Sequence, residues 1–225
     1  MTSITIARIT HSARRTVSLI VQPDGQLEVR APLGYSDAKI RELVNTKRGW
    51  IEKKQAQAQK NNQHISRHSF RAGETFLFLG VVYPLAIVQK QSSALSFKRG
   101  FWLAESALPR AEAVFEAWYR AQARRVISER VSHFAQLHGF NYNAIRISGA
   151  KTRWGSCSSK GNLSFTWRLV MAPVDVIDYV VLHELAHLRE PNHSPKFWKL
   201  VATMMPNYTV YRRWLKQNGA QLTLG

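Results

Sequence analysis

Apolar and polar positions alternate along the start of the chain and then change to a helical spacing. Alternation is typical of strands with one buried face, and it predicts three strands, at residues 4–9, 15–21 and 26–31, with a Pro-Asp-Gly turn at 23–25 before the third. From Ser36 to Lys60 the apolar residues recur every three or four positions. This pattern predicts a helix that is capped by Ser36 and weakened midway by Gly49.

Two further segments have the pattern of hairpins. Residues 76–88 are apolar on both sides of Gly80, and residues 94–104 are divided by Arg99-Gly100. With the preceding segments they predict a β-rich N-terminal region with one helix, residues 1–104.

The remaining residues, 105–225, mix helices with short strands. A long helix is predicted from Pro109 to His138, with four arginines on its outer surface: Arg120, Arg124, Arg125 and Arg130. Short strands are predicted at 144–149, 152–158 and 162–167, and helices at 175–188 and 208–216. The predicted fold class is therefore α+β, and residues 105–225 either form a second domain or continue the first.

The most informative motif is HELAH, in which His183 and His187 flank Glu184 and Leu185-Ala186. Residues four apart lie on one face of a helix, so the two imidazoles can converge on one point, and Glu184 can reach a water molecule there. This is the arrangement of zinc hydrolases, with the glutamate as general base. The alternative is histidines that hydrogen-bond in the core or face solvent. Burial of these groups on a mostly apolar helix is costly unless they are paired or ligated.

A catalytic zinc ion needs a third protein ligand. No Asp or Glu occurs from Pro191 to Gly225, so a downstream carboxylate is excluded and His193 remains. Pro191 ends the helix, and the resulting turn can bring His193 back to the other two histidines. The alternative for His193 is a capping or surface role before Ser194-Pro195, which read as the N-cap and first residue of the next helix.

Several other residues are weaker candidates for the site. The strand at 152–158 could pair with an extended polypeptide substrate, which makes Trp154, Gly155 and Ser156 candidate substrate-binding residues. The alternative is that Trp154 and Cys157 only pack on the helix. Two aspartates could orient the imidazoles, and two tyrosines could donate a hydrogen bond to an oxyanion: Asp175, Asp178, Tyr208 and Tyr211.

The composition adds a strong positive charge. There are 32 basic and 14 acidic residues, a net charge of +18, which favours DNA or another polyanion as a partner, although it can also serve solubility alone. No apolar run of about 18 residues exists, so no membrane association is expected. The single cysteine and the absence of an apolar leader make the cytoplasm the expected location.

Residues 151–198, from KTRWGSC through WRL and HELAHL to NHSPKFW, resemble the YgjP-like metallopeptidase family, which is related to the SprT-like zinc proteases. The resemblance implies a zincin-like catalytic region and zinc-dependent peptide hydrolysis. It also implies His183, His187 and His193 as ligands and Glu184 as the base. Thr166 departs from the pattern, because asparagine is expected before WRL, so no substrate-binding role is carried over to it.

Three functions are compatible with these observations. The first is a zinc metallopeptidase that uses a metal-activated water and a glutamate base. The second is a basic nucleic-acid-associated binding module with a structural or vestigial zinc site, or, combining both, a protease that acts on DNA-bound proteins. The third is a hydrolase of non-peptide amides, which shares the same zinc chemistry. Oligomeric state is not indicated by the sequence.

Overall fold

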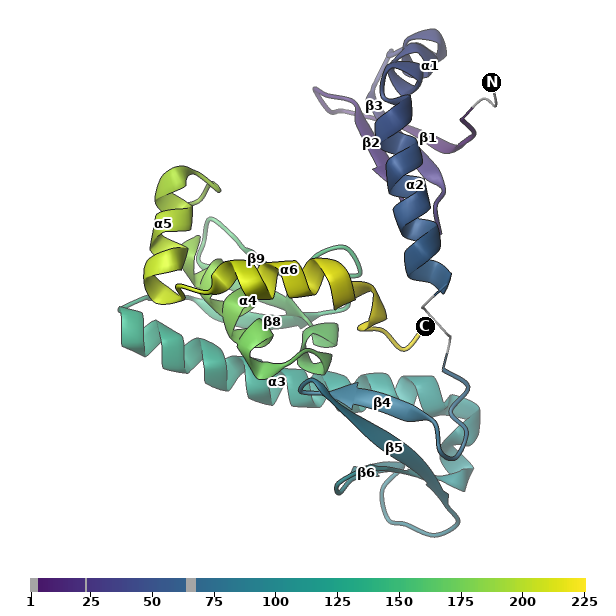
Figure 1. Ribbon diagram of the computed structural model, residues 1–225, viewed down its shortest axis with the longest axis vertical. Coiled ribbons are helices and arrows are strands. Elements are labelled where there is room, and N and C mark those ends of the chain that lie inside the picture. Colours follow the sequence, from purple (N-terminus) through teal and green to yellow (C-terminus); the bar gives the residue numbers. More distant parts are fainter. Residues whose placement is uncertain (1–3, 23, 64–67) are drawn as a thin grey trace. The chain divides into compact units, whose positions relative to one another are not determined.

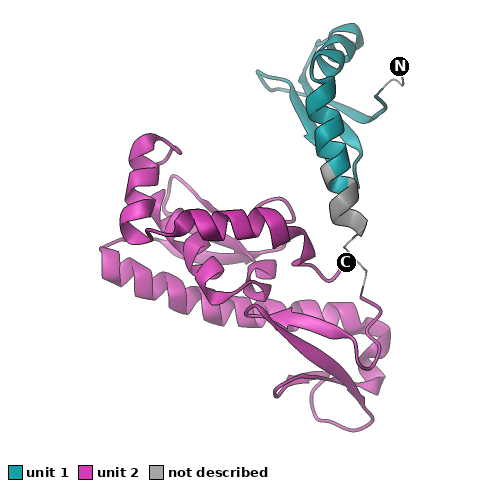
Figure 2. Ribbon diagram, in the orientation of Figure 1, with its two compact units in different colours: residues 1–66 teal, residues 67–225 magenta. Residues whose placement is uncertain are grey.

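The computed structural model describes residues 4–22, 24–63 and 68–225, which fall into two compact units, 1–66 and 67–225 (Figure 2). This boundary lies ahead of the one expected after residue 104. The two hairpins that precede residue 104 belong to the second unit, because their aromatic side chains pack on its longest helix: Phe76 stacks on Phe115 with ring centroids 4.3 Å apart. Each unit is described by itself below.

The first unit is a three-stranded sheet with two helices (Figure 1). Its strands are β1 (Ile6–Ser12), β2 (Ser18–Val21) and β3 (Leu27–Pro32), in the order β1-β3-β2. The central strand β3 runs parallel to β1 and antiparallel to β2. Its alternating side chains are fully buried and form a small core with residues of the helices: Leu27, Val29, Ala31, Ile40, Val44 and Ile51.

The helix predicted from Ser36 to Lys60 is interrupted. Ser36 caps α1 (Asp37–Thr46) as expected, through its hydroxyl and the Lys39 amide, but the helix ends at Lys47. A second helix, α2 (Arg48–Gln63), starts at the next residue with Gly49 in its first turn. Glycine has a low helix propensity because it loses the most backbone entropy, which explains a break at this point. Within the predicted turn at 23–25, Pro23 lies outside the described residues.

The second unit begins with a four-stranded sheet, and both predicted hairpins are present. The strands are β4 (Thr75–Phe78), β5 (Val81–Val88), β6 (Leu95–Phe97) and β7 (Phe101–Ala104), in the order β4-β5-β7-β6. Both hairpins turn where the sequence predicted, near Gly80 and at Arg99-Gly100, and the backbone φ values of +79° at Gly80 and +55° at Arg99 are left-handed.

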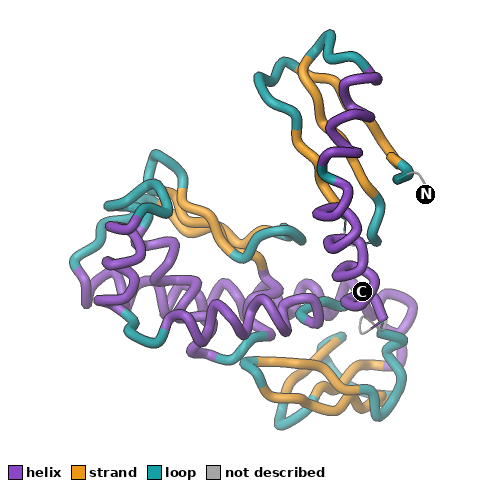
Figure 3. The backbone as a smooth tube through the Cα atoms, turned by 45° about the horizontal axis from the view of Figure 1, so that its top comes forward, coloured by secondary structure: helices purple, strands orange, loops and turns teal. Residues whose placement is uncertain are grey.

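The long helix α3 (Ala111–His138) follows a 3-10 turn, η1 (Glu105–Arg110), and ends at Gly139 in the left-handed conformation. It contacts both sheets of the unit (Figure 3). Arg130 was expected on its outer surface together with the other three arginines. Instead, its guanidinium donates to both carboxylate oxygens of Asp178, at 2.5 and 2.6 Å, and thereby joins α3 to α4.

The second sheet is formed by β8 (Ala144–Ser148), β9 (Gly155–Cys157) and β10 (Asn162–Thr166), with β10 in the centre. A 3-10 turn, η2 (Trp167–Met171), leads into α4 (Val174–Ala186), which is followed by α5 (Pro195–Met204), α6 (Tyr208–Asn218) and a final turn, η3 (Gly219–Gln221). In Figure 1, α4 lies between α3 and α6. Ser194 caps α5 as expected, accepting from the Phe197 amide.

The start of α4 is fixed by the hairpin between β4 and β5. The amides of Leu79 and Gly80 donate to the carbonyls of Val170 and Met171, at 2.9 and 3.1 Å. Gly80 approaches so closely that an added Cβ would lie 2.8 Å from the Cα of Pro173, the residue before α4. No described helix is both long enough and apolar enough to cross a bilayer.

Candidate metal centre

Helix α4 carries the motif at its C-terminal end. Ten of its residues are buried, including Glu184, and His183 is half-buried on the last turn. The helix ends at Ala186, and His187 is its C-cap residue with helical φ and ψ values of −65° and −17°. The helical geometry therefore extends through both histidines, which keeps them on one face.

The chain turns back directly after His187. The amides of Arg189 and Glu190 donate to the carbonyl of Ala186, and Pro191 prevents the helix from continuing. This turn brings His193 to the other two histidines, with Nε2 of His193 and Nε2 of His183 only 2.9 Å apart.

The three imidazoles form a cluster in which one ligand nitrogen of each lies within 4.8 Å of the others. A tetrahedral zinc ion with bonds of ~2.0–2.1 Å separates its nitrogen ligands by about 3.3 Å, so these nitrogens need only small shifts to surround one ion. The chemistry of the set also fits, because imidazole nitrogen is a preferred zinc ligand. Nδ1 of His183 is buried without a hydrogen-bond partner among the described residues.

The tautomer of His187 is set by its neighbour. Nδ1 of His187 lies 3.1 Å from the carbonyl oxygen of Glu190, which can only accept, so this nitrogen carries the proton. Nε2 therefore presents its lone pair to the cluster. A backbone carbonyl thus orients this imidazole, a common arrangement for histidine ligands of metals.

The surroundings keep two of the imidazoles neutral. Burial, and then the positive fields of His187, His193 and Arg212, lower the pKa of His183 to about 3. Burial also lowers the pKa of His193, and His187 and Arg212 lower it further. Neutral imidazole is the form that binds a metal ion, so neither group must lose a proton at neutral pH.

Phe197 braces the cluster from α5. Its ring is fully buried, and its centroid lies 4.9, 4.5 and 4.8 Å from those of His183, His187 and His193. The first turn of α5 therefore packs against all three imidazoles. This agrees with the expectation that Phe197 belongs to the core.

Glu184 is buried beneath β9. An added Cβ on Gly155 would lie 2.6 Å from Oε1 of Glu184, so the glycine allows the carboxylate to fit under the strand. Burial raises the pKa of Glu184 to about 8, although the positive field of Arg153 opposes that shift. This pKa lies closer to neutral pH than that of a free carboxylate, so the group can both accept and release a proton there.

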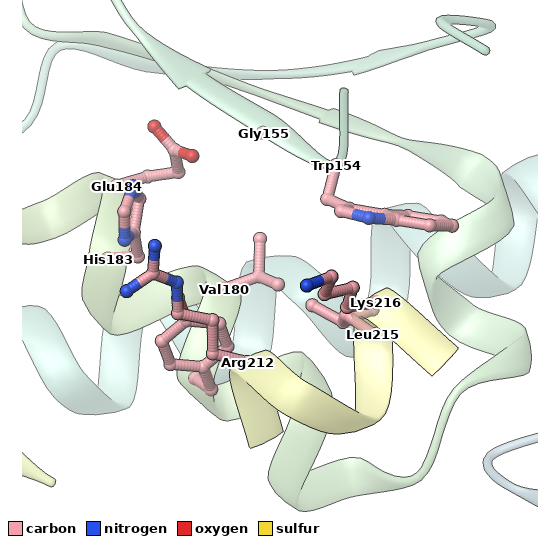
Figure 4. A pocket seen from close by; sticks show the side chains of 9 residues that line it. Trp154, Gly155, Val180, His183, Glu184, Arg212, Leu215 and Lys216 are labelled. Carbon is pink, nitrogen blue, oxygen red and sulfur yellow. The ribbon is translucent and has the colours of Figure 1, made fainter. Parts of the chain in front are cut away.

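Two hollows open at this centre, and Gly155, His183 and Glu184 line both. The smaller, of about 340 Å³, is shown in Figure 4. The larger, of about 740 Å³, extends along β9 past Ser156. All three histidines line the larger hollow, and His183 also lines the smaller one.

The three predicted substrate-binding residues all lie at these hollows. Trp154 and Gly155 line the smaller one, and Gly155 and Ser156 line the larger one. Trp154 also packs on the end of α6, because an added Cβ on Gly219 would lie 2.7 Å from its Cζ2. The packing role and the substrate role of Trp154 are therefore compatible.

Cys157 follows these residues and lines the larger hollow, but it is not part of the histidine cluster. Its thiol lies 3.5 Å from the carbonyl of Ser158, to which it donates. Burial and the nearby Glu184 raise the pKa of this thiol, which keeps it protonated.

Thr166 occupies the position where asparagine is expected, and its side chain makes a structural contact. It is buried at the end of β10, and its hydroxyl donates to the carbonyl of Ala150 at 2.8 Å, while its amide donates to the carbonyl of Trp154. The threonine thereby holds the loop that precedes β9.

The aspartates expected to orient the imidazoles do not contact them. Asp178 accepts from Arg130, and Asp175 is exposed in the first turn of α4. Helical spacing explains this outcome, because Asp178 lies five residues before His183 and therefore on another face. Tyr208, one of the candidate oxyanion donors, stacks on Trp198 at 5.4 Å.

Sequence analysis missed Arg212 and Lys216. Both line the smaller hollow from α6, and the Arg212 guanidinium also lies over the Trp198 ring, 4.6 Å from its centroid. The signal that could have identified them is their spacing of four, which places both on one helix face, in a segment without acidic residues.

Comparisons with known proteins identify the family of the chain. Among curated proteins, no sequence matches the chain. A solved structure, the metallopeptidase zymogen abylysin of Pyrococcus abyssi, is similar over 40% of this chain and 93% of its own, with 21% identity and a TM-score of 0.37. The model of the YgjP-like metallopeptidase domain matches residues 15–218, which span both units. The chain therefore belongs to the YgjP-like metallopeptidase family.

Proposed function

We propose that this protein is a zinc metallopeptidase in which His183, His187 and His193 hold the metal ion and Glu184 is the general base. The observation that carries the proposal is the convergence of the three imidazoles within 4.8 Å, beside a buried carboxylate and at the wall of the larger hollow. Family membership supports metal-dependent hydrolysis.

A zinc ion bound by the histidines would supply a Lewis acid that lowers the pKa of water toward about 7 and polarises the carbonyl to be cleaved. Glu184 accepts the proton of the attacking water and delivers it to the leaving amine. Its burial beneath Gly155 keeps it close to the histidines and away from competing solvent. His187 is held in the ligating tautomer by the carbonyl of Glu190.

The substrate is a polypeptide that binds beside β9. This strand pairs with β10 along one edge, and no other strand pairs with it among the residues that the structure describes. An extended peptide could add to the free edge and gain backbone hydrogen bonds there. Gly155 and Ser156 would then lie against the substrate backbone at the metal centre.

The test combines metal content with hydrolysis. Elemental mass spectrometry of the purified protein should find one zinc ion per chain, and His193→Ala should lose most of it. His133→Ala is the matched control, because His133 is exposed on α3 and outside the cluster. Glu184→Gln should keep the metal and lose peptide hydrolysis. Undiminished zinc in His193→Ala, or full activity in Glu184→Gln, contradicts the corresponding assignment.

The net charge of +18 favours a second candidate, a nucleic-acid-associated module or a protease that acts on DNA-bound proteins. Binding to DNA that weakens steeply with salt, without any peptide hydrolysis, would support the module with a structural or vestigial zinc site. Cleavage that increases when the substrate protein is bound to DNA would support the combined function. Location in the cytoplasm stays a prediction.

A further inference from the structure

Two cations of α6 line the smaller hollow. Arg212 and Lys216 are one helical turn apart, and Figure 4 shows both rising from α6 toward the hollow, Arg212 on the side of His183 and Lys216 on the side of Trp154. Val180 lies between them in the same view, and Leu215 lies beside Lys216. The cations are therefore presented over an apolar floor next to the metal centre.

Neither cation has an acidic partner among the described residues. The ion pairs of the described chain involve other residues, and the segment from Pro191 to the end of the chain contains no Asp or Glu. Glu184 is the one carboxylate that lines this hollow, and its side chain packs against Gly155. Two like charges on one helix face repel each other, and a bound anion would relieve this repulsion.

The two cations line only one of the two hollows. The larger hollow is lined by serines, Asn141 and apolar groups besides the histidines and Glu184, and no Lys or Arg side chain is among its lining residues. A substrate that occupies both hollows would therefore meet these cations in the smaller hollow only.

We propose that Arg212 and Lys216 form a subsite for a substrate carboxylate, so that the enzyme prefers peptides with Asp or Glu, or with the free C-terminus, on one side of the scissile bond. The inference rests on the proposed peptidase function. The hollow of about 340 Å³ is at the small end of ligand sites, which suits one side chain. The apolar wall of Val180, Leu215 and Trp154 can cover the methylene groups, while the cations bind the oxygens.

The first experiment measures cleavage of a peptide series in which each position around the scissile bond carries Glu or Gln, with the C-terminus free or amidated. Wild type should cleave the Glu peptide about 10-fold faster, in kcat/KM, at one position only, as expected for a charge-assisted hydrogen bond. If the free C-terminus alone confers the preference, the bound carboxylate is the terminal one. Lys216→Met should remove most of the preference, and Lys216→Glu should invert it toward Lys.

Arg213→Met is the matched control, since Arg213 is exposed on the same helix and does not line the hollow. This variant loses the same unit of charge and should keep the preference. An equal loss in Arg213→Met and Lys216→Met would assign the effect to the general positive field and overturn the subsite. Equal cleavage of all Glu and Gln peptides by wild type, with no difference between free and amidated C-termini, would overturn it as well.

A binding measurement separates this inference from the proposed function. Isothermal titration calorimetry of the same peptides into the full-length Glu184→Gln variant, as purified, needs no hydrolysis. Glu peptides should bind about 10-fold more tightly than Gln peptides, with a difference that shrinks as salt screens the charges. Tighter binding of the Glu peptides, without any cleavage by wild type, would support the subsite and refute the peptidase function. Cleavage by wild type, without a preference for Glu peptides in either assay, would support the peptidase function and refute the subsite.

Discussion

The carboxylate of Glu184 lies directly against the backbone of Gly155, where an added Cβ would be 2.6 Å from Oε1 and from Cγ of the glutamate. This contact joins the two motifs, GSC on β9 and HELAH on α4, into one site. Gly155 is therefore required by the position of the Glu184 carboxylate, because even a methyl group would force the glutamate to move.

Gly155→Ala is predicted to impair hydrolysis while metal binding persists. The methyl group displaces the Glu184 carboxylate from the attacking water, and a misplacement of about 1 Å can cost ~100-fold in rate. The measurements are kcat/KM for a peptide substrate and zinc content. Gly49→Ala is the control, since nothing lies within 4 Å of an added Cβ there. Unchanged kcat/KM in Gly155→Ala would mean that the contact does not position the glutamate.

Phe197→Ala is predicted to weaken metal binding. The buried ring contacts all three imidazoles, so its removal leaves them free to rotate, and loss of a group that orients metal ligands costs about 10-fold or more in affinity. Competition with a zinc chelator measures the change. Val201→Ala, equally buried on the same helix, also destabilises the fold, but it should leave zinc affinity close to that of wild type. Equal losses in both variants would reduce the role of Phe197 to general stability.

Asp178→Asn is predicted to lower stability without altering the metal site. The carboxylate is buried and accepts two hydrogen bonds from Arg130, so the amide leaves a guanidinium with poorer pairing. The expected loss is about 1–3 kcal/mol in the free energy of unfolding, since the arginine is partly exposed to solvent. Urea denaturation measures it, with exposed Asp175→Asn as the control. Loss of zinc from Asp178→Asn, at unchanged stability, would restore its expected role in orienting an imidazole.

Glu74→Gln is predicted to destabilise the protein at neutral pH but not in acid. Burial alone would raise the pKa of Glu74, but hydrogen bonds from the Arg71 amide, the His68 ring and the Ser69 amide outweigh it, so the pKa is lowered. The ionised group therefore stabilises the fold above its unfolded pKa of about 4.3, and this contribution disappears as pH falls through the lower folded value.

Unfolding by urea at several pH values checks the sign for Glu74. The difference between wild type and Glu74→Gln should be largest near pH 7 and should shrink below about pH 4. A stability difference that grows in acid would show instead that the effect of burial on the pKa of Glu74 outweighs the effect of its hydrogen bonds.

Local patterns in the sequence predicted much of this fold. The caps Ser36 and Ser194 and the turns at Gly80 and Arg99 depend on residues adjacent in the chain, and the structure has them as predicted. The convergence of His183 and His187 follows from helical spacing in the same way. The return of His193 depends on a short turn, which Pro191 indicates.

Contacts between distant segments could not be predicted. Arg130 was predicted to lie on the surface from the helical spacing of the apolar residues around it. That spacing cannot predict a contact with Asp178, which lies 48 residues later on another helix. The unit boundary was expected too late because the stacking of Phe76 on Phe115 is a long-range contact. Arg212 was missed for the same reason: the hollow exists only where α6 meets α4 and β9.

The bonds from Leu79 and Gly80 to Val170 and Met171 have a practical consequence for anyone who shortens this protein. A fragment cut at residue 105 would retain every histidine of the cluster, but it would remove the hairpin that fixes the residues just before α4. It would also expose the aromatic face of α3 on which Phe76 and Phe101 pack. Such an exposed apolar surface is prone to aggregation. A shortened protein that contains the second unit should therefore begin ahead of β4, so that the hairpin between β4 and β5 is retained.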